Sequence, residues 1–344
     1  MFKSELLKKF RGCLIGGAIG DALGYPVEFL KREEILKIYG NEGITDLIVK
    51  DNSNSEFSDD TQMTLFTAEG ILIFENYKII NSSYVDHKKV MYHSYLRWLY
   101  TQGFPLKNFE EINVGFLIKI RELYKIKAPG KTCISALSSG KMGTLDNPIN
   151  NSKGCGGVMR IAPCGLAYPK NVAFDMAVDF SAITHGHPTG YLAGGALAYF
   201  ISAIIDGLDL EEALMEVISK LKNCKKSEEL VEALIEAYKL SKSSLGDISA
   251  IPKLGQGFTG EEALSISLYC ALKYRNDFRK ALISAVNHDG DSDSTGAITG
   301  NILGAYLGID NIPKEWIQKI ELKDVILKIA DDLFELSQKT RRIY

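Results

Sequence analysis

Two short clusters of acidic and hydroxyl side chains are the residues of this sequence best suited to do chemistry. The first is Ser58-Asp59-Asp60-Thr61, and the second lies within residues 290–296, which read GDSDSTG. An apolar segment with helical spacing, residues 297–307, follows the second cluster, so its carboxylates are expected at the start of a buried helix. Carboxylates removed from water are normally protonated, paired or bound to metal, and no Lys or Arg lies within several residues to pair them. The two clusters therefore predict a site for a hard divalent cation.

The spacing of Asp289, Asp291 and Asp293 is similar to the start of an EF-hand calcium loop. That loop requires Gly at its sixth position and Glu at its twelfth, where this sequence has Ser294 and Gly300. The calcium-loop hypothesis is therefore rejected. Two clusters that each offer two carboxylates and a hydroxyl can instead surround a pair of small divalent ions about 3.5–4 Å apart. Mg²⁺ or Mn²⁺ suits a set of ligands made only of oxygen atoms.

Helices must position both clusters, and the sequence predicts where they begin. Ser58 is a natural N-cap for a helix that continues through Leu72. The helix dipole favours an acidic residue in the first turn, but it does not account for three oxygen-bearing side chains in a row. An earlier predicted helix, residues 6–23, carries four glycines: Gly12, Gly16, Gly17 and Gly20. Because Gly is a poor helix former, so many glycines indicate close approach by another helix or by a ligand, and both interpretations stay open.

Helical periodicity recurs through most of the remaining chain. The helices that we expect cover residues 85–100, most of 174–240, 261–274, 277–287, the segment after Asp293, and 324–337. The segment from 100 to about 150 is predicted to be mostly connecting loop with shorter helices. No alternating run long enough for a strand is present, and neither a linker nor a repeat is evident. We therefore predict an all-α fold with a single domain over residues 1–344.

Two further motifs could contact a substrate. Residues 154–160, GCGGVMR, could present backbone N–H groups to a phosphate, although a plain loop fits the same residues. Cys155 could act as a nucleophile only with a base beside it, which a sequence does not show. His185, in the sequence THGHP, is expected to make a hydrogen bond instead of binding metal, because the acids already supply hard oxygen ligands.

Composition argues against several classes of function. The chain has 344 residues, of which 46% are hydrophobic and 24% charged, as in globular proteins. Its formal net charge of −3 and its scattered lysines provide no basic surface for nucleic acid. The six cysteines include no C-x-x-C pair, and the N-terminus has no signal-peptide pattern. We expect reduced cysteines, a cytoplasmic location, no membrane or nucleic-acid partner, and a monomer.

From about residue 8 to residue 310, these motifs resemble those of the ADP-ribosylglycohydrolase family. Five family elements, G-x-x-x-G-D-A-x-G, [ST]-D-D-T, G-x-G-x-x-M-R, T-H-x-H-P and G-D-x-D-[ST], occur in the family's order at 16–24, 58–61, 154–160, 184–188 and 290–294. The resemblance implies a single compact orthogonal multi-helix bundle with two Mg²⁺ or Mn²⁺ ions as cofactors. The metal ligands that it implies are Ser58, Asp59, Asp60, Asp291, Asp293 and Ser294.

The resemblance also implies which groups surround the substrate. Glu28 matches the family's acidic residue close to the metals and the scissile ribose, although a glutamate on such a loop is often simply solvated. The implied contacts to ADP-ribose are Ser152, Gly154, Cys155, Gly156, Gly157 and His185. Many members have Asn where this chain has Cys155, so a side-chain hydrogen bond and the acceptor preference stay open.

The implied activity is metal-dependent removal of ADP-ribose from an ADP-ribosylated protein, with the N-glycosidic bond to arginine as the first choice. Cleavage at C1 of the ribose develops oxocarbenium-like charge on the sugar, and Glu28 or Asp60 would act as the acid or base. Three alternatives stay open. They are hydrolysis of serine-linked or other ADP-ribosyl bonds, a binuclear-metal phosphohydrolase, and a catalytically silent relative that binds ADP-ribose.

Overall fold

Closely packed glycines join two helices from opposite ends of the chain, α1 (Lys3–Gly24) and α15 (Ser292–Leu307). The computed structural model describes residues 3–49, 54–80, 85–106 and 109–344. A Cβ atom added at Gly20 would lie 2.0 Å from the carbonyl oxygen of Gly296, and one added at Gly16 would lie 2.4 Å from that of Gly300. Contacts of the same kind join Gly12 to Gly304 and Gly24 to Ser292. The two helices are therefore antiparallel, and these glycines permit close helix packing instead of contacting a ligand.

Replacing Gly20 by Ala is expected to destabilise the fold, because the new methyl group would meet the backbone of α15. Overpacking of a core typically costs about 1–3 kcal/mol, so we expect the melting temperature to fall by a few degrees. Gly246→Ala is the matched control, because Gly246 has a φ of −70° and no atom lies within 4 Å of an added Cβ. Equal melting temperatures of the two variants, measured by calorimetry, would contradict this account of the α1–α15 contact.

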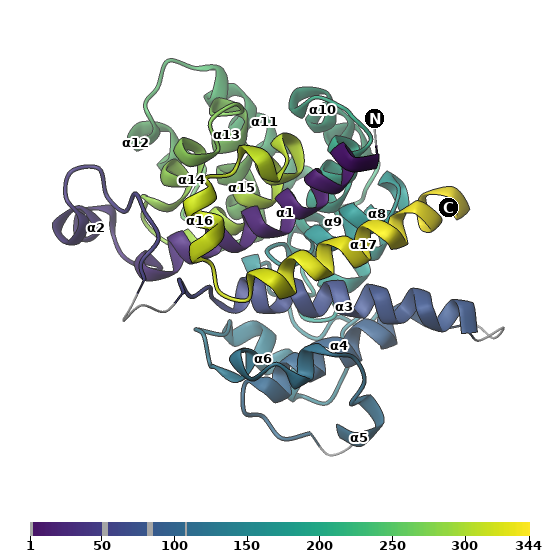
Figure 1. Cartoon of the computed structure of the whole chain (residues 1–344). Helices are drawn as coiled ribbons and strands as arrows, with labels where there is room; N and C mark the ends of the chain where they lie inside the picture. The colour runs from purple at the N-terminus through teal and green to yellow at the C-terminus, as the bar shows by residue number, and fades with distance from the viewer. Residues whose placement is uncertain (1–2, 50–53, 81–84, 107–108) are drawn as a thin grey trace.

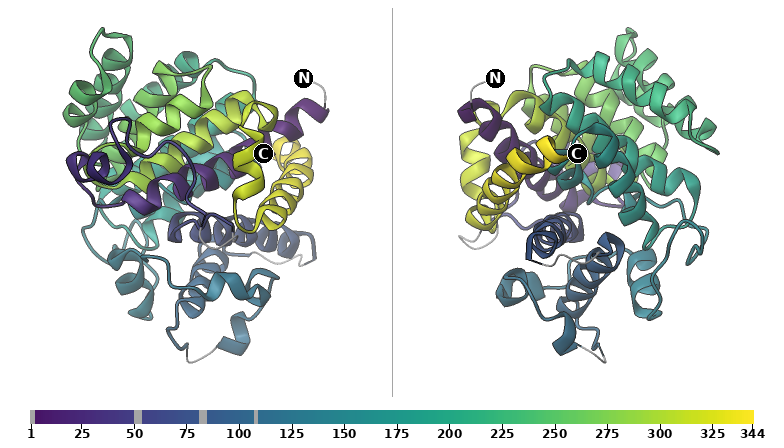
Figure 2. Two further views of the ribbon diagram at one scale, coloured as in Figure 1. Left: turned by 60° about the vertical axis from the view of Figure 1, so that its left-hand side comes forward. Right: turned by 90° about the vertical axis from the view of Figure 1, so that its right-hand side faces the viewer.

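The remaining helices surround α1, with α17 (Lys323–Ile343) beside it (Figure 1). One side of the molecule, lowest in that view, contains α3 (Asp59–Ile80), α4 (His87–Thr101), α5 (Phe109–Ile112) and α6 (Lys131–Ser138). The opposite side contains α10 (Leu210–Lys222), α11 (Glu228–Lys242), α12 (Asp247–Ala250), α13 (Gly260–Lys273) and α14 (Phe278–Val286). Behind α1 are α8 (Lys170–Ala182) and α9 (Pro188–Ile205), and α7 (Ala162–Ala167) packs against α9; the right-hand view of Figure 2 shows this teal part of the chain from the side.

Shorter elements complete the chain. The two remaining α-helices are α2 (Arg32–Tyr39) and α16 (Lys314–Lys319). The 3₁₀ turns are η1 (Tyr25–Val27), η2 (Leu117–Lys119), η3 (Arg121–Tyr124), η4 (Cys155–Gly157), η5 (Ile251–Lys253) and η6 (Ile309–Asn311). Within the described ranges the only extended pairings are two isolated bridges, Ser55 with Ile320 and Gly154 with Thr259. The prediction of an all-α fold is therefore confirmed, whereas the single domain over residues 1–344 stays a prediction.

Helix α9 is apolar on nearly every side because it lies in the core. By length and hydropathy alone it is able to cross a membrane, but 89% of its residues are buried inside the protein. A helix that is hydrophobic all round is expected at the centre of a large core. Its composition therefore gives no separate indication of a membrane span.

Candidate metal and substrate site

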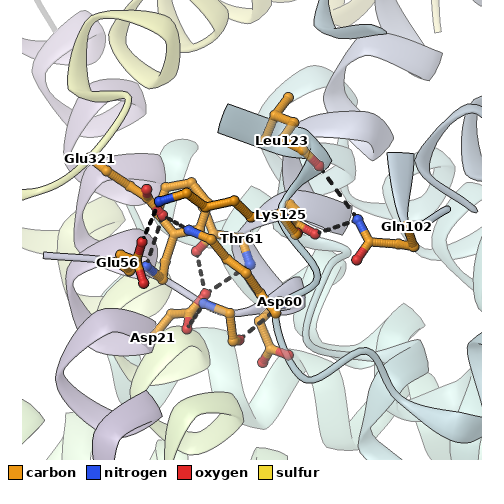
Figure 3. Close-up of polar contacts among 12 residues, drawn as sticks. Asp21, Glu56, Asp60, Thr61, Gln102, Leu123, Lys125 and Glu321 are labelled. Carbon is orange, nitrogen blue, oxygen red and sulfur yellow. Dashed lines mark hydrogen bonds and ion pairs between the residues drawn. The ribbon is translucent and has the colours of Figure 1, made fainter. Parts of the chain in front are cut away.

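Asp21, near the end of α1, holds the first acidic cluster in place. Its buried carboxylate accepts hydrogen bonds from the backbone amides of Ser58 (2.8 Å) and Thr61 (2.9 Å), and from Thr61 Oγ1 (2.6 Å) (Figure 3). Burial raises the pKa of Asp21 to about 6, and the hydrogen bonds from Thr61 and Ser58 oppose this rise. Sequence reasoning gave Asp21 no role, although its place in the G-D-A motif was a signal that could have found it. A carboxylate of α1 thus fixes the turn in which α3 begins.

A buried ion pair fixes the same turn from another direction. Lys127 pairs with Glu321, and Glu321 also accepts a hydrogen bond from the amide of Phe57 (3.1 Å). The carbonyl of Lys127 accepts one from the amide of Asp59 (3.0 Å). The start of α3 is therefore tied to the loop before α6 and to the loop before α17, which gives its side chains a defined position.

The two acidic clusters meet although they are more than 200 residues apart in sequence. Ser294, in the first turn of α15, donates a hydrogen bond from Oγ to Asp60 Oδ2 (2.8 Å). Ser58 Oγ accepts one from the amide of Asp60 (3.2 Å), which confirms its predicted capping role. Asp291 caps α15 through the amide of Ser294 (3.4 Å). The structure thus places both clusters at helix N-termini that lie next to one another.

Asp59 and Asp293 complete this group of acids. Asp59 Oδ2 accepts a hydrogen bond from the amide of Gly130 (3.2 Å), and Asp293 Oδ1 accepts one from the amide that follows it (2.9 Å). Asp289 instead turns away and accepts a hydrogen bond from the first amide of α2 (2.7 Å). That direction agrees with the rejection of the calcium loop, in which Asp289 would be the first ligand.

The acids are buried close together, and no charged partner for them is found among the described residues. Asp59, Asp60, Asp291 and Asp293 are each 7% exposed or less, and in the part of the chain that the structure describes none of them forms an ion pair with Lys, Arg or His. Burial raises the pKa of Asp59 to about 8 and that of Asp60 and Asp293 well above the usual range, and neighbouring carboxylates add to each rise. Such a group of acids favours a bound cation, because a cation offsets both the free-energy cost of burying the carboxylates and the repulsion between them.

The chemistry of the donors fits Mg²⁺ or Mn²⁺. Carboxylate and hydroxyl oxygens are the ligands that hard divalent ions prefer. Among the described residues, no group of three or more His, Cys, Asp or Glu side chains is arranged so that it could hold a metal ion by itself. This is compatible with Mg²⁺, which usually keeps several waters and takes few carboxylates. The predicted set of six side chains could supply such a mixed shell from two sides.

Glu28 lies at the edge of the acids, directly after the turn η1. Its side chain is partly exposed, and burial together with the charges of Asp291, Asp59 and Asp21 raises its pKa to about 8. A simply solvated glutamate would not show this shift. Glu28 is therefore the acid at this site that can reach both solvent and the buried carboxylates.

Two exposed aromatic rings flank the second acidic cluster. Phe29 has a φ of +62°, and its amide donates a hydrogen bond to the carbonyl of Gly290 (2.8 Å). The loop that carries Phe258 accepts a hydrogen bond from the amide of Asp291 through the carbonyl of Gln256 (2.8 Å). The two rings are 62% and 42% exposed, and their centroids lie 6.0 Å apart. Sequence reasoning missed this pair, because isolated phenylalanines carry no signal of their exposure.

The glycine loop lies against the same acids. Cys155 donates a hydrogen bond from Sγ to Asp291 Oδ2 (3.0 Å). Burial and the charges of Asp291 and Asp60 raise the pKa of the Cys155 thiol. Because a nucleophilic cysteine needs a lowered pKa, the thiol serves as a hydrogen-bond donor and not as a nucleophile.

Two amides of the glycine loop already have partners. The amide of Gly154 donates to Ser152 Oγ (3.2 Å), and that of Cys155 donates to the carbonyl of Phe258 (3.1 Å). Neither of these two amides is therefore available to an anion at this loop. Of the six predicted substrate contacts, Gly154 and Cys155 therefore have amides that already donate hydrogen bonds within the protein, which the sequence does not show.

His185 lies directly against the glycine loop. The imidazole is only 1% exposed, and a Cβ atom added at Gly156 would lie 2.9 Å from its Cε1 atom. One added at Gly154 would lie 3.4 Å from its Nε2 atom. The glycines therefore make room for the edge of the ring, and the predicted contacts of the loop and of His185 belong to one surface.

Comparisons with known proteins point to one family. A sequence model of the family described as ADP-ribosylglycohydrolase matches residues 3–343. An uncharacterized protein of Archaeoglobus fulgidus is 30% identical over 96% of this chain and 98% of its own length. The ADP-ribosylarginine hydrolase Tri1 of Pseudomonas putida is 25% identical over 96% of this chain and 79% of its own length. A solved structure described as an ADP-ribosylglycohydrolase-related protein complex superimposes with a TM-score of 0.70 at 24% identity, covering 97% of this chain and 99% of that one, and so shares its fold.

Proposed function

Because the chain belongs to the ADP-ribosylglycohydrolase family, we propose that it releases ADP-ribose from arginine side chains of modified proteins by hydrolysing the N-glycosidic bond. The observation that carries the proposal is the meeting of two buried acidic clusters beside a glycine loop and a partly exposed glutamate. The acceptor in the name of the Pseudomonas putida relative supports arginine. The site must bind a sugar, a diphosphate and a cationic acceptor, and it offers hydroxyls, a glycine loop and carboxylates for them.

We further propose two Mg²⁺ or Mn²⁺ ions as cofactors. Their ligands would be Ser58, Asp59, Asp60, Asp291, Asp293 and Ser294. What such ions supply when bound is Lewis acidity and orientation at the scissile ribose. The protein contributes the fixed positions of these side chains, through Asp21, the helix caps and the Lys127–Glu321 pair.

Glu28 is the residue that we assign to proton transfer. Asp60 Oδ2 already accepts the hydroxyl of Ser294, whereas the Glu28 carboxyl faces both solvent and the acids. Burial is the largest cause of the raised pKa of Glu28 and does not depend on the charges of the metal-binding acids, so this carboxyl can hold a proton and deliver it from its oxygen to the leaving nitrogen. Loss of that proton returns Glu28 to a carboxylate, which stabilises positive charge developing on the ribose and accepts the proton that water gives up when its oxygen bonds to C1.

The exposed rings of Phe29 and Phe258 favour a planar cationic acceptor. They flank the loop that carries Asp291, and aromatic faces attract a guanidinium group through cation–π contact. A serine-linked acceptor presents no such group. Phe258→Ala is therefore expected to lower kcat/KM for ADP-ribosylarginine roughly tenfold, or about 1.4 kcal/mol, and to change the affinity for free ADP-ribose much less.

Phe104→Ala serves as its control, because Phe104 is similarly exposed at 38% but follows α4, away from the acids. Both variants would be compared with the parent protein by steady-state kinetics on an ADP-ribosylarginine peptide. If Phe258→Ala and Phe104→Ala gave the same kcat/KM, the rings would have no part in acceptor choice.

The activity itself is tested with arginine-linked, serine-linked and nucleotide-linked ADP-ribose substrates read out by mass spectrometry. We expect intact ADP-ribose and unmodified arginine as products, formed with Mg²⁺ or Mn²⁺ and abolished by EDTA. Nucleotide fragments would instead identify a phosphohydrolase. Binding of ADP-ribose without turnover of any substrate would identify a silent relative, and faster release from serine would reassign the acceptor.

A further inference from the structure

Arg160 is a fully buried cation that lacks the usual carboxylate partner. It is 0% exposed, and no carboxylate among the described residues lies within ion-pair distance of its guanidinium. Its contacts include the ring of Tyr95, 4.2 Å from the guanidinium carbon, the sulfur atoms of Cys133 (3.3 Å) and Met63 (3.6 Å), and the carbonyl of Phe180 (3.2 Å). A buried charge without a counter-charge is costly unless its hydrogen bonds are well satisfied. Its shortest hydrogen bond goes to Thr184.

The contact between Arg160 and Thr184 starts a chain of hydrogen bonds with a defined direction. Arg160 Nη2 lies 2.7 Å from Thr184 Oγ1, and Thr184 Oγ1 lies 2.8 Å from His185 Nδ1. A guanidinium donates and never accepts, so Thr184 Oγ1 is the acceptor in the first bond. The hydroxyl proton of Thr184 is then free to be donated to Nδ1, and a buried hydroxyl without an acceptor would be unfavourable.

The direction of the chain selects one tautomer of His185. A neutral imidazole carries one N–H, and if Nδ1 accepts from Thr184 then the proton is on Nε2. Nε2 makes no hydrogen bond to any residue that the structure describes, and it faces the glycine loop, where an added Cβ at Gly156 would lie 3.2 Å away. His185 therefore offers one unused N–H at the surface assigned to the substrate.

The same surroundings keep the imidazole uncharged. Burial, followed by the nearby charge of Arg160, lowers the pKa of His185 to about 3. The ring consequently donates as a neutral group throughout the range in which an enzyme of this kind works. Its donor strength does not change with pH, unlike that of an exposed histidine.

We propose that Arg160 and Thr184 are positioning residues that hold His185 in the Nε2–H tautomer, so that it donates one hydrogen bond to an oxygen of ADP-ribose at the glycine loop. The identity of this ligand rests on the proposed function, whereas the tautomer does not. Arg160 and Thr184 would not touch the substrate themselves. They would act on it only by fixing the tautomer and position of His185.

The tautomer is measured directly by ¹⁵N NMR of histidine-labelled protein. The chain has five histidines, and the His185→Gln variant identifies the signals that belong to His185. We expect a protonated Nε2 and an unprotonated Nδ1 at pH values from about 5.5 to 8, without titration of the ring in that range. A protonated Nδ1, or an imidazolium at neutral pH, would overturn the proposal.

Three substitutions test the role of Thr184. Thr184→Val removes the hydroxyl and is expected to mix the tautomers and weaken ADP-ribose binding about tenfold, while Thr184→Ser keeps both close to the parent. Thr299→Val is the matched control, because Thr299 is also buried but donates its hydroxyl only to the carbonyl of Thr295 (2.7 Å) within α15.

Melting temperatures of all three show whether a loss of binding merely reflects unfolding. An unchanged tautomer and unchanged affinity in folded Thr184→Val would overturn the positioning role. If the parent protein shows the Nε2–H tautomer but does not bind ADP-ribose, the positioning of the ring stands and the proposed function fails.

Discussion

Asp60→Asn is expected to lower the rate of ADP-ribose release by about 1,000-fold or more, equivalent to roughly 4 kcal/mol of lost transition-state stabilisation. Asp60 is the acid at which the two clusters touch, through Ser294 Oγ. The substitution keeps the shape of the side chain but removes the charge that a divalent cation requires. Asp293→Asn should have the same effect, since Asp293 belongs to the other cluster and the charge of Asp60 adds to the rise in its pKa.

The stability of these variants should stay the same or increase, although their activity falls. Each substitution removes one of several buried carboxylates that repel one another, so the chelator-treated variants should melt at or above the temperature of the chelator-treated parent. Asp289→Asn is the matched control, because Asp289 lies in the loop before α15 but accepts a hydrogen bond from the first amide of α2, and the activity of this variant should stay within about twofold of the parent. Full turnover by Asp60→Asn in excess Mg²⁺ would remove Asp60 from the site.

The stability of the metal-free protein should fall as pH rises from about 4 to about 8. The pKa of Asp21 is raised to about 6, and those of Glu28 and Asp59 are raised to about 8. Between the usual carboxyl pKa near 4 and these values, the folded protein binds more protons than the unfolded chain, so the free energy of unfolding decreases with pH. This contribution is fully present below about pH 4 and is lost above about pH 8.

Mg²⁺ is expected to oppose this loss of stability. Carboxylates must give up their protons to bind a cation, so binding strengthens as pH rises. The increase in melting temperature on adding Mg²⁺ should therefore be larger near pH 8 than near pH 5, measured by scanning calorimetry with and without EDTA. Asp59→Asn should show both a weaker pH dependence without metal and a smaller Mg²⁺ effect. A Mg²⁺ effect that is independent of pH would contradict a site built from these acids.

Local signals in the sequence predicted much of the fold and identified the two acidic clusters that the fold brings together. The period of apolar residues identified α1, α3, α15 and α17, and Ser58 marked the start of α3, because capping and helical amphipathicity act within a few residues. The same periodicity did not predict α2 or α16, which span only 8 and 6 residues. The cytoplasmic location and monomeric state stay predictions.

Apart from the pairing of the two acidic clusters, contacts between distant segments were not predicted from the sequence. Asp21 is an ordinary acid at the end of a helix until the fold brings the amides of Ser58 and Thr61 to it. The role of the glycines in α1 likewise depended on finding α15 as their partner, because close approach by a ligand predicts the same composition. The direction of the hydrogen bonds through Thr184 depends on the side chains of Arg160, Thr184 and His185 lying together in the fold. The spacing of these residues in the sequence does not predict that contact.

The claim on which the proposals depend most is that the two acidic clusters bind divalent cations together. The most direct measurement is titration of Mn²⁺ into chelator-treated protein by isothermal calorimetry, with parent, Asp60→Asn, Asp293→Asn and Asp289→Asn compared under one condition. We expect about two ions per parent chain, the same for Asp289→Asn, and a loss of binding when either cluster loses its acid. Equal Mn²⁺ binding by all four proteins would contradict a shared metal site between α3 and α15.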